Sequence, residues 1–308
     1  MSAPLRPTRI GPVAFAWGSR TFVMGICNVT PDSFSGDGLL RSGRAAFDAE
    51  TAADHAETAA EALARTVEQA RAMVAEGADL LDIGGESTRP GHLPVSAGAE
   101  IARVVPVIVA VRAALPDVPI SVDTSKPEVA EAAIAAGADL LNDVRGTRAD
   151  DALARIAAAR GLPIVLMHDR DVMDSADVIA DVIADLGAAV ERAERAGVAP
   201  ESIIVDPGFG FGKTPEQNVA ILRELGALRV LGRPILLGTS RKSTLGWILD
   251  LPVEERLEGT LATTALGVAA GADVVRVHDV QANVRAARVS DAIIRGHWRA
   301  DAPQGGQR

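Results

Sequence analysis

Apolar residues in this chain gather in short runs bounded by glycine, proline or polar residues, and Ala-rich amphipathic stretches separate the runs. Short bounded runs predict buried strands, whereas apolar positions spaced three to four apart predict helices. The runs predict eight strands, at Phe22–Val29, Asp79–Gly85, Pro119–Asp123, Asp139–Val144, Pro163–His168, Ser202–Asp206, Pro234–Gly238 and Asp273–Val277. The intervening stretches predict eight helices, at Ala59–Ala75, Ala99–Ala114, Pro127–Ala136, Asp150–Ala159, Ala176–Ala196, Pro215–Leu225, Gly259–Ala270 and Gln281–Arg295.

Strict alternation of strands and helices indicates an α/β fold with a parallel sheet. A doubly wound sheet has the same continuous apolar strands, but eight repeats favour a closed (β/α)8 TIM barrel. We expect a single barrel domain at 22–299, an N-terminal extension at 1–21 whose Pro12–Trp17 forms a hairpin against the lower end, and a disordered tail at 300–308. The Ala/Glu-rich run Arg44–Arg65 predicts an extended helical insertion after the first strand.

The tripeptide Gly-Ala-Asp occurs three times, starting at Gly77, Gly137 and Gly271. Each copy follows an amphipathic stretch and precedes an apolar run, which is the pattern of a helix ended by glycine and followed by a buried strand. Polar residues follow each run, and parallel α/β folds place their chemistry at this end of the strands.

Composition excludes several classes of protein. A net charge of -10 and 3% aromatic residues, with no tyrosine, argue against a nucleic-acid-binding protein. No apolar run approaches the roughly 20 residues that span a bilayer, so a membrane protein is not expected. The single cysteine, Cys27, cannot form an intrachain disulfide, and no secretory pattern opens the chain, so we expect a cytoplasmic location.

Four polar residues come at or just after different predicted strands: Asp123, Asn142, Asp206 and Lys242. Because all strands of a barrel open on one face, these side chains can converge although they are far apart in sequence. Two carboxylates, an amide and an ammonium suit a flat heterocycle with mixed donors and acceptors better than a metal cage. The alternative is an internal polar network that satisfies itself.

A second group of residues suggests an anion site. Arg276 and His278 alternate along the last strand, so both can point to one face, and Asn28 ends the first strand. After the second strand, Thr88 and Arg89 can donate to an anion. No activated Ser or Cys accompanies His278, which argues against nucleophilic catalysis.

The segment Asp206–Thr214, DPGFGFGKT, is rich in glycine but does not match the phosphate-loop pattern. We expect its glycines to let the backbone approach a ligand, with Phe211 as an apolar wall. The Arg89 side chain could instead pair with Glu86, and His168 could simply close the fifth strand.

These motifs resemble the dihydropteroate synthase family, the pterin-binding enzymes of folate synthesis and the targets of sulfonamides. NVTPDSFS, GGESTRPG, SVDTSKPEVA, NDVRG, LMH, DPGFGFGKT, TSRKS and RVHDV occur in the family's order between Asn28 and Val280. A series of ordered motifs is far more specific than any one of them. The resemblance implies condensation of a pterin diphosphate with 4-aminobenzoate, with Mg²⁺ as cofactor and a homodimer as the assembly.

The resemblance also assigns roles to residues. The implied pterin site comprises Asp123, Asn142, Met167, Asp206, Phe211 and Lys242. The implied diphosphate site comprises Asn28, Thr88, Arg276 and His278, with Asn28 also reaching the metal. The implied 4-aminobenzoate pocket comprises Phe34, Thr88, Arg89, Pro90 and Ser243. Catalytic roles fall to Asp123, Lys242, Arg276 and His278.

One loop departs from the family pattern, because Ser35 is followed by Gly36-Asp37-Gly38 and the acidic residue is shifted by one place. Three alternatives remain beside an active synthase. They are a paralogue that binds a pterin without coupling it, a pterin-binding methyltransferase subunit serving a corrinoid protein, and a non-catalytic scaffold. The paired STRP and SRKS motifs argue against the methyltransferase subunit.

Overall fold

The computed structural model describes residues 5–29, 59–86, 95–146, 151–171 and 177–296. Its strands are β1 (Thr8–Ile10), β2 (Val13–Phe15), β3 (Phe22–Asn28), β4 (Leu80–Gly84), β5 (Ile120–Asp123), β6 (Leu140–Asp143), β7 (Ile164–Met167), β8 (Ile203–Asp206), β9 (Leu236–Leu237) and β10 (Val274–Val277). Its α-helices are α2 (Ala59–Ala75), α3 (Ala97–Ala114), α4 (Pro127–Ala136), α5 (Ala152–Arg160), α6 (Val178–Arg195), α7 (Pro215–Arg223), α8 (Ser243–Leu249), α9 (Leu257–Ala270) and α10 (Val280–Arg295).

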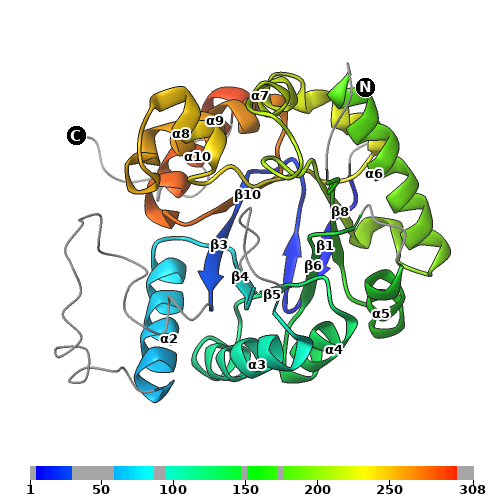
Figure 1. Cartoon of the computed structure of the whole chain (residues 1–308), viewed down its shortest axis with the longest axis vertical. Coiled ribbons are helices and arrows are strands. Elements are labelled where there is room, and N and C mark those ends of the chain that lie inside the picture. The colour runs from blue at the N-terminus through cyan, green and yellow to red at the C-terminus, as the bar shows by residue number, and fades with distance from the viewer. Residues whose placement is uncertain (1–4, 30–58, 87–94, 147–150, 172–176, 297–308) are drawn as a thin grey trace, which may run out of the picture.

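Strands β3 to β10 form one parallel sheet in the order β8-β7-β6-β5-β4-β3-β10-β9. A parallel bridge between Val205 and Ile235 joins β8 to the start of β9, and the Val205 amide donates to the Pro234 carbonyl at 2.9 Å. The sheet is therefore closed, and helices surround it in an outer ring (Figure 1). Closure confirms the barrel and rules out the doubly wound alternative.

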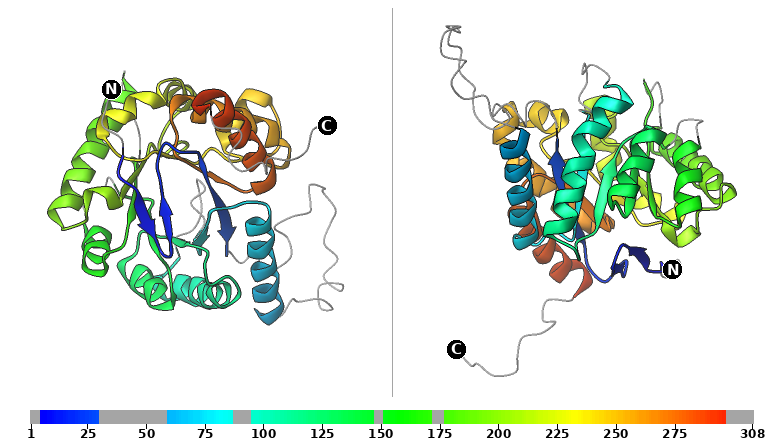
Figure 2. Two further views of the ribbon diagram at one scale, coloured as in Figure 1. Left: turned by 180° about the vertical axis from the view of Figure 1, so that it is seen from behind. Right: turned by 90° about the horizontal axis from the view of Figure 1, so that it is seen from below.

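The first two strands form an antiparallel hairpin that covers the N-terminal end of the barrel (Figure 2). Phe15 is fully buried, and its ring centroid lies 4.7 Å from that of Phe22 on β3. The Trp17 indole packs beside them and donates to Thr8 Oγ1 at 2.8 Å. The predicted hairpin is thus present and supplies the aromatic floor of the barrel.

Buried apolar residues form two layers on the two faces of the sheet. One layer lies between the strands and the outer helices and includes Leu81, Val122 and Leu141. The other lies inside the barrel near the hairpin and includes Met24 and Leu80. Since side chains alternate across a strand, the inward positions beyond this floor are left for the polar residues described below.

The Gly-Ala-Asp repeats have one structural role. Gly137 and Gly271 directly follow α4 and α9, and Gly77 comes two residues after the end of α2. Their φ angles are positive, at 112°, 103° and 106°, the conformation that commonly ends a helix. The aspartates that follow accept hydrogen bonds from backbone amides of the neighbouring strands: Asp79 from Val23 at 2.8 Å, Asp139 from Ile120 at 2.9 Å, and Asp273 from Ile235 at 3.0 Å. Each repeat therefore ends a helix and fixes the start of an adjacent strand.

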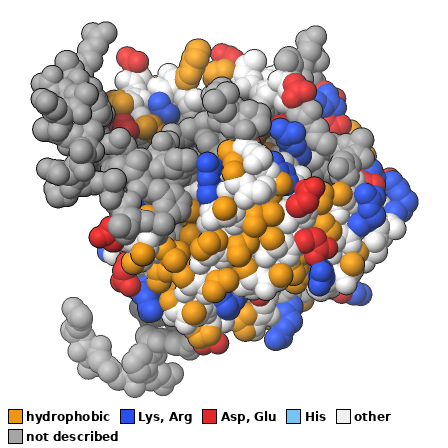
Figure 3. Space-filling view, turned by 60° about the horizontal axis from the view of Figure 1, so that its bottom comes forward, with side chains coloured by type: hydrophobic (Ala, Val, Ile, Leu, Met, Phe, Trp, Pro, Cys, Tyr) orange, Lys and Arg blue, Asp and Glu red, His pale blue; other side chains and the backbone are white. Residues whose placement is uncertain are grey.

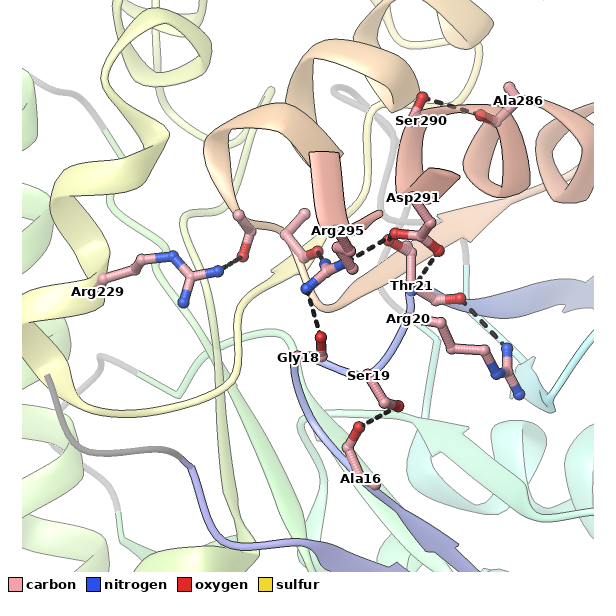
Figure 4. A network of polar contacts seen from close by, with 12 residues as sticks. Ala16, Gly18, Ser19, Arg20, Thr21, Arg229, Ala286, Ser290, Asp291 and Arg295 are labelled. Atoms are coloured by element: carbon pink, nitrogen blue, oxygen red, sulfur yellow. Dashed lines mark hydrogen bonds and ion pairs between the residues drawn. The ribbon is translucent and has the colours of Figure 1, made fainter. Parts of the chain in front are cut away.

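The last helix is tied to the chain that enters β3 (Figure 4). Asp291 on α10 accepts from the Thr21 amide at 2.7 Å and from its hydroxyl at 2.9 Å. Arg295 donates to Asp291 at 2.7 Å and to the Gly18 carbonyl at 3.0 Å. These bonds lock the hairpin, the first barrel strand and the last helix together at the lower end.

Helix α8 and the 3-10 turns at Pro200–Ser202, Leu225–Leu231 and Val253–Glu255 are absent from the sequence-based prediction. Elements this short carry too few residues for a clear apolar period. Most of the predicted Arg44–Arg65 insertion and the predicted tail at 300–308 lie outside the described residues.

Candidate active site

Polar side chains occupy the inward positions at the carboxyl ends of the barrel strands. Asp123 on β5 pairs in register with Asn142 on β6, and Met167 on β7 pairs with Asp206 on β8. All four side chains are buried, with exposed fractions of 9% or less. The structure therefore brings together the residues that the sequence placed at separate strand ends.

Arg276 on β10 bridges two carboxylates across the barrel. Its Nε donates to Asp82 Oδ2 at 2.6 Å, and an Nη donates to Asp123 Oδ2 at 2.7 Å. Burial opposes the charge on the guanidinium, but the two carboxylates raise the pKa of Arg276 above its usual value. Burial also raises the pKa of Asp123 to about 7, against the opposing effect of Arg276.

Asp82 on β4 was missed by the sequence-based prediction. It is fully buried, and its Oδ2 also accepts from the Asn142 amide at 3.1 Å, while its Oδ1 has no hydrogen-bond partner. Asp82 could have been identified in the same way as Asp123, because it is a carboxylate within the apolar run LLDIG just as Asp123 is within ISVD. The internal polar network considered as an alternative is thus part of this site, because it orients Arg276 and Asn142.

Asp206 and Lys242 lie on the adjacent side of the barrel mouth. Burial raises the pKa of Asp206 and lowers that of Lys242 to about 8. Asp206 Oδ1 accepts from the Gly208 amide at 2.7 Å. Lys242 Nζ donates to the Phe209 carbonyl and lies 4.5 Å from the centroid of the Phe211 ring. An acceptor, a donor and an aromatic face therefore lie near one another at this side of the barrel mouth.

Two glycines of the β8–α7 loop allow close packing of backbone on backbone. Gly208 and Gly212 have φ angles of 65° and 61°, and a Cβ on either would overlap the carbonyl oxygen of His168 or of Arg170, respectively. These two glycines therefore let the loop approach the segment that follows β7, and the expected approach of the loop to a ligand stays a prediction. His168 does more than close its strand, since its buried ring bonds to Asp185 and to Lys213.

His278 follows β10 and is held in one orientation by Ser240. The Ser240 hydroxyl oxygen accepts from the His278 backbone amide at 3.1 Å and lies 2.9 Å from Nδ1. When the Ser240 hydroxyl donates its proton to Nδ1, neutral His278 carries its own proton on Nε2. Next to Ser240, Arg241 adopts a positive φ of 56° and forms a two-point ion pair with Asp279.

The remaining predicted residues are at the rim or outside the described part. Asn28 is the exposed last residue of β3, and Ser243 is the exposed first residue of α8. Phe34, Thr88, Arg89 and Pro90 lie outside the described residues. Among the described residues, no group of three or more His, Cys, Asp or Glu could hold a metal ion. No helix in these segments combines the length and apolar character needed to cross a bilayer.

Comparisons with known proteins agree with this geometry. Residues 52–278 match the model of the pterin binding enzyme family. Dihydropteroate synthase of Clostridium beijerinckii is 47% identical over 288 residues, which cover 93% of this chain and 99% of that protein.

Two solved structures are also similar. The first is dihydropteroate synthase from Clostridium difficile in the presence of pteroic acid, with 44% identity, a TM-score of 0.81, and coverage of 91% of this chain and 99% of that one. The second is the Xanthomonas albilineans enzyme with 4-aminobenzoic acid, with 40% identity, a TM-score of 0.79, and coverage of 91% and 94%. The polar layer at the barrel mouth, the matched family model and the similar proteins lead to one conclusion: this chain belongs to the dihydropteroate synthase family of pterin binding enzymes.

Proposed function

We propose that this protein condenses 6-hydroxymethyl-7,8-dihydropterin diphosphate with 4-aminobenzoate, giving 7,8-dihydropteroate and diphosphate. The observation that carries the proposal is the convergence of Asp206, Lys242 and the Phe211 ring beside the Arg276–Asp123 pair. A flat, nitrogen-rich ring matches that combination of acceptor, donor and aromatic surface.

The pterin is held by complementary donors and acceptors. Asp206 accepts from the 2-amino group and N3–H, and Lys242 donates to the ring carbonyl. Asn142 adds an amide on the opposite side, and Phe211 and Met167 contact the ring surfaces. Because Asp206 and Asn142 are buried, these bonds form away from competing water, which favours selectivity.

Departure of diphosphate from the pterin methylene leaves a cation that the electron-rich ring delocalises. Arg276 and the Nε2–H of His278 stabilise the charge of the leaving group, and the Asp123 carboxylate favours the pterin cation. The arylamine then attacks the methylene carbon. The incoming amine is itself the nucleophile, so the mechanism requires no covalent bond to the protein.

We propose that Mg²⁺ enters with the diphosphate and contacts Asn28. Magnesium commonly keeps several waters and takes only one or two protein oxygens together with substrate phosphates. The Asn28 amide at the end of β3 fits that kind of site. The bound ion would supply positive charge that offsets the charge on the leaving diphosphate.

The arylamine pocket is proposed at Phe34, Thr88, Arg89, Pro90 and Ser243. Arg89 and Ser243 would bind the carboxylate, since a guanidinium and a hydroxyl both donate to it. Thr88 would also contact the diphosphate. Sulfonamides, which resemble 4-aminobenzoate, would then compete for the same pocket.

We propose a homodimer that uses the face formed by α8, α9 and α10, which lie together in Figure 1. Trp247, Leu266 and Ile293 are 75%, 63% and 75% exposed there, and large exposed apolar patches mark interaction sites. Figure 3 shows a second gathering of hydrophobic side chains on another face, and Val109 on α3 is 52% exposed. Light scattering that gives twice the mass of 31.9 kDa would agree with the dimer.

We propose a cytoplasmic location. The one cysteine, Cys27, is buried and forms no disulfide, which suits the reducing cytoplasm.

The function is tested by a coupled assay of purified protein with the pterin diphosphate, 4-aminobenzoate and Mg²⁺. We expect 7,8-dihydropteroate and diphosphate in equal amounts, and none without magnesium. Binding of the pterin without product would identify a non-coupling paralogue. Product formation that requires a corrinoid protein and a methyl donor would identify the methyltransferase alternative.

Pterin binding is expected to be tightest between about pH 7 and 8. Asp123, with a pKa raised to about 7 mainly by burial, loses its negative charge as the pH falls through that value. Lys242, with a pKa lowered to about 8 by burial, loses its positive charge as the pH rises through that value. Both charges are present together only between the two limits, so affinity falls on either side.

Calorimetric titrations from pH 5.5 to pH 9.5 would measure this dependence. Lys242→Arg should move the alkaline limb upward because a guanidinium stays charged. An affinity that does not change across the range would contradict the assignment of both groups.

A further inference from the structure

A chain of polar groups runs from the surface to the back of the pterin site, outside the residues assigned above. Arg170 donates to both carboxylate oxygens of Asp185 on α6, at 2.6 and 2.8 Å. Asp185 Oδ2 lies 3.0 Å from Nε2 of His168, whose side chain is fully buried. His168 Nδ1 in turn lies 2.9 Å from Lys213 Nζ. The chain leads from the surface to the loop that follows β8.

The hydrogen-bond partners define the protonation of this chain. Asp185 is an acceptor, so His168 carries its proton on Nε2 and offers a lone pair at Nδ1. Lys213 Nζ has two further acceptors, the carbonyl oxygens of Gly208 at 2.9 Å and of Phe211 at 3.0 Å. Three acceptors match the three N–H bonds of an ammonium group, although burial lowers the pKa of Lys213 to about 7 against the opposing charge of Asp206. Burial lowers the pKa of His168 to about 4, which keeps the ring neutral as this arrangement requires.

The two carbonyls that Lys213 binds lie on either side of Phe209, the residue whose own carbonyl accepts from Lys242. The Gly208 amide is bound to Asp206, and the Phe211 ring lies against the Lys242 ammonium. One lysine therefore fixes the loop that joins the pterin acceptor, the pterin donor and the aromatic face. The segment after β7 limits movement of this loop, because the two backbones are in close contact at Gly208 and Gly212.

We propose that Lys213, held by neutral His168 and Asp185, is a positioning residue that sets the pterin-binding geometry of the β8–α7 loop. It acts through the carbonyls of Gly208 and Phe211 and does not touch the pterin. The pocket proposed for 4-aminobenzoate lies on other loops, so the effect of Lys213 is confined to the pterin substrate. This inference rests on the proposed function.

The test replaces Lys213 with methionine, an unbranched side chain one atom shorter that removes the charge and the donors. We expect the Kd for the pterin diphosphate, measured by calorimetry without 4-aminobenzoate, to rise by about tenfold or more, the effect of one lost charge-assisted hydrogen bond. The KM for 4-aminobenzoate should stay within about twofold of the wild-type value, because that pocket contributes separately to binding.

Arg112→Met is the matched control. Arg112 also binds backbone carbonyls and an aspartate, namely Gly137 at 2.8 Å, Val118 at 2.9 Å and Asp139, but it lies at the opposite end of the barrel. Its loss should lower Tm and leave the pterin Kd unchanged. If Lys213→Met does not fold, Asp185→Ala serves instead, since this carboxylate is partly exposed, and the pterin Kd should rise about threefold.

Two results would overturn the inference: a pterin Kd within about twofold of wild type in the folded variants, or a parallel loss of pterin and 4-aminobenzoate use that Arg112→Met reproduces. Measurements on the wild-type protein distinguish failure of this inference from failure of the proposed function. A wild type that neither binds pterin diphosphate nor forms product contradicts the function itself, whereas a wild type that does both, beside an unaffected Lys213→Met, contradicts only the role of Lys213.

Discussion

Replacement of Asp206 by alanine is expected to weaken binding of the pterin diphosphate by at least about two orders of magnitude. Each hydrogen bond to a charged group contributes about 1.5–3 kcal/mol, and Asp206 would accept two of them from the pterin. Two bonds correspond to about 3–6 kcal/mol, and each 1.4 kcal/mol is about tenfold in affinity. Calorimetric titration with the pterin diphosphate measures the loss directly.

Two variants make this prediction specific. Asp206→Asn keeps the shape of the side chain and the acceptor for the Gly208 amide, so a loss nearly as large as that of the alanine variant would identify the carboxylate charge as the cause. Arg89→Ala should instead raise the KM for 4-aminobenzoate and leave pterin affinity close to wild type. Equal loss of pterin binding in Arg89→Ala would show that the two pockets are not divided as proposed.

Arg276→Met should destabilise the protein by about 3–5 kcal/mol, the range for removing one member of a buried ion pair. Without the guanidinium, Asp82 and Asp123 are left buried near each other without an ion-pair partner, and only the Lys242 ammonium acts on Asp123 from a distance. Protonation of one carboxyl would relieve only part of that cost. Urea unfolding monitored by circular dichroism would measure the difference, and turnover should be lost in parallel.

A second substitution tests the cause. In Arg276→Met combined with Asp82→Asn, one of the two stranded charges is removed, so a substantial part of the lost stability should return. Turnover should not return, because the proposed contact to the diphosphate is still missing. Equal stability of the single and double variants would show that Asp82 does not contribute to the loss of stability.

The barrel could be predicted from the sequence because the signals for its strands and helices are local. A parallel strand buried on both faces reads as an apolar run, and the glycines of the Gly-Ala-Asp repeats mark where helices stop. Helix α4 begins at Pro127 and ends at Ala136, as predicted. Helix α8 was missed because it has only seven residues, one of them Gly246.

The site was predictable only as far as single positions stand out from their surroundings. Asp123 is conspicuous as a charge inside an apolar strand, but nothing local shows that Arg276, at the other end of the chain, neutralises it. Lys213 was seen only as part of a failed phosphate-loop pattern. Its partner His168 follows a different strand, β7, and pairings of this kind depend on which loops meet in the closed barrel.

The aspartates of the three repeats hold strand starts at the lower end of the barrel, whereas every proposed substrate contact lies at the upper end. The bonds that hold the strand starts are therefore separate from the proposed substrate contacts. Strand-end substitutions that keep the Arg276 ion pairs can change ligand choice without loosening the strand starts, which makes this barrel a suitable host for engineered binding of other flat heterocycles.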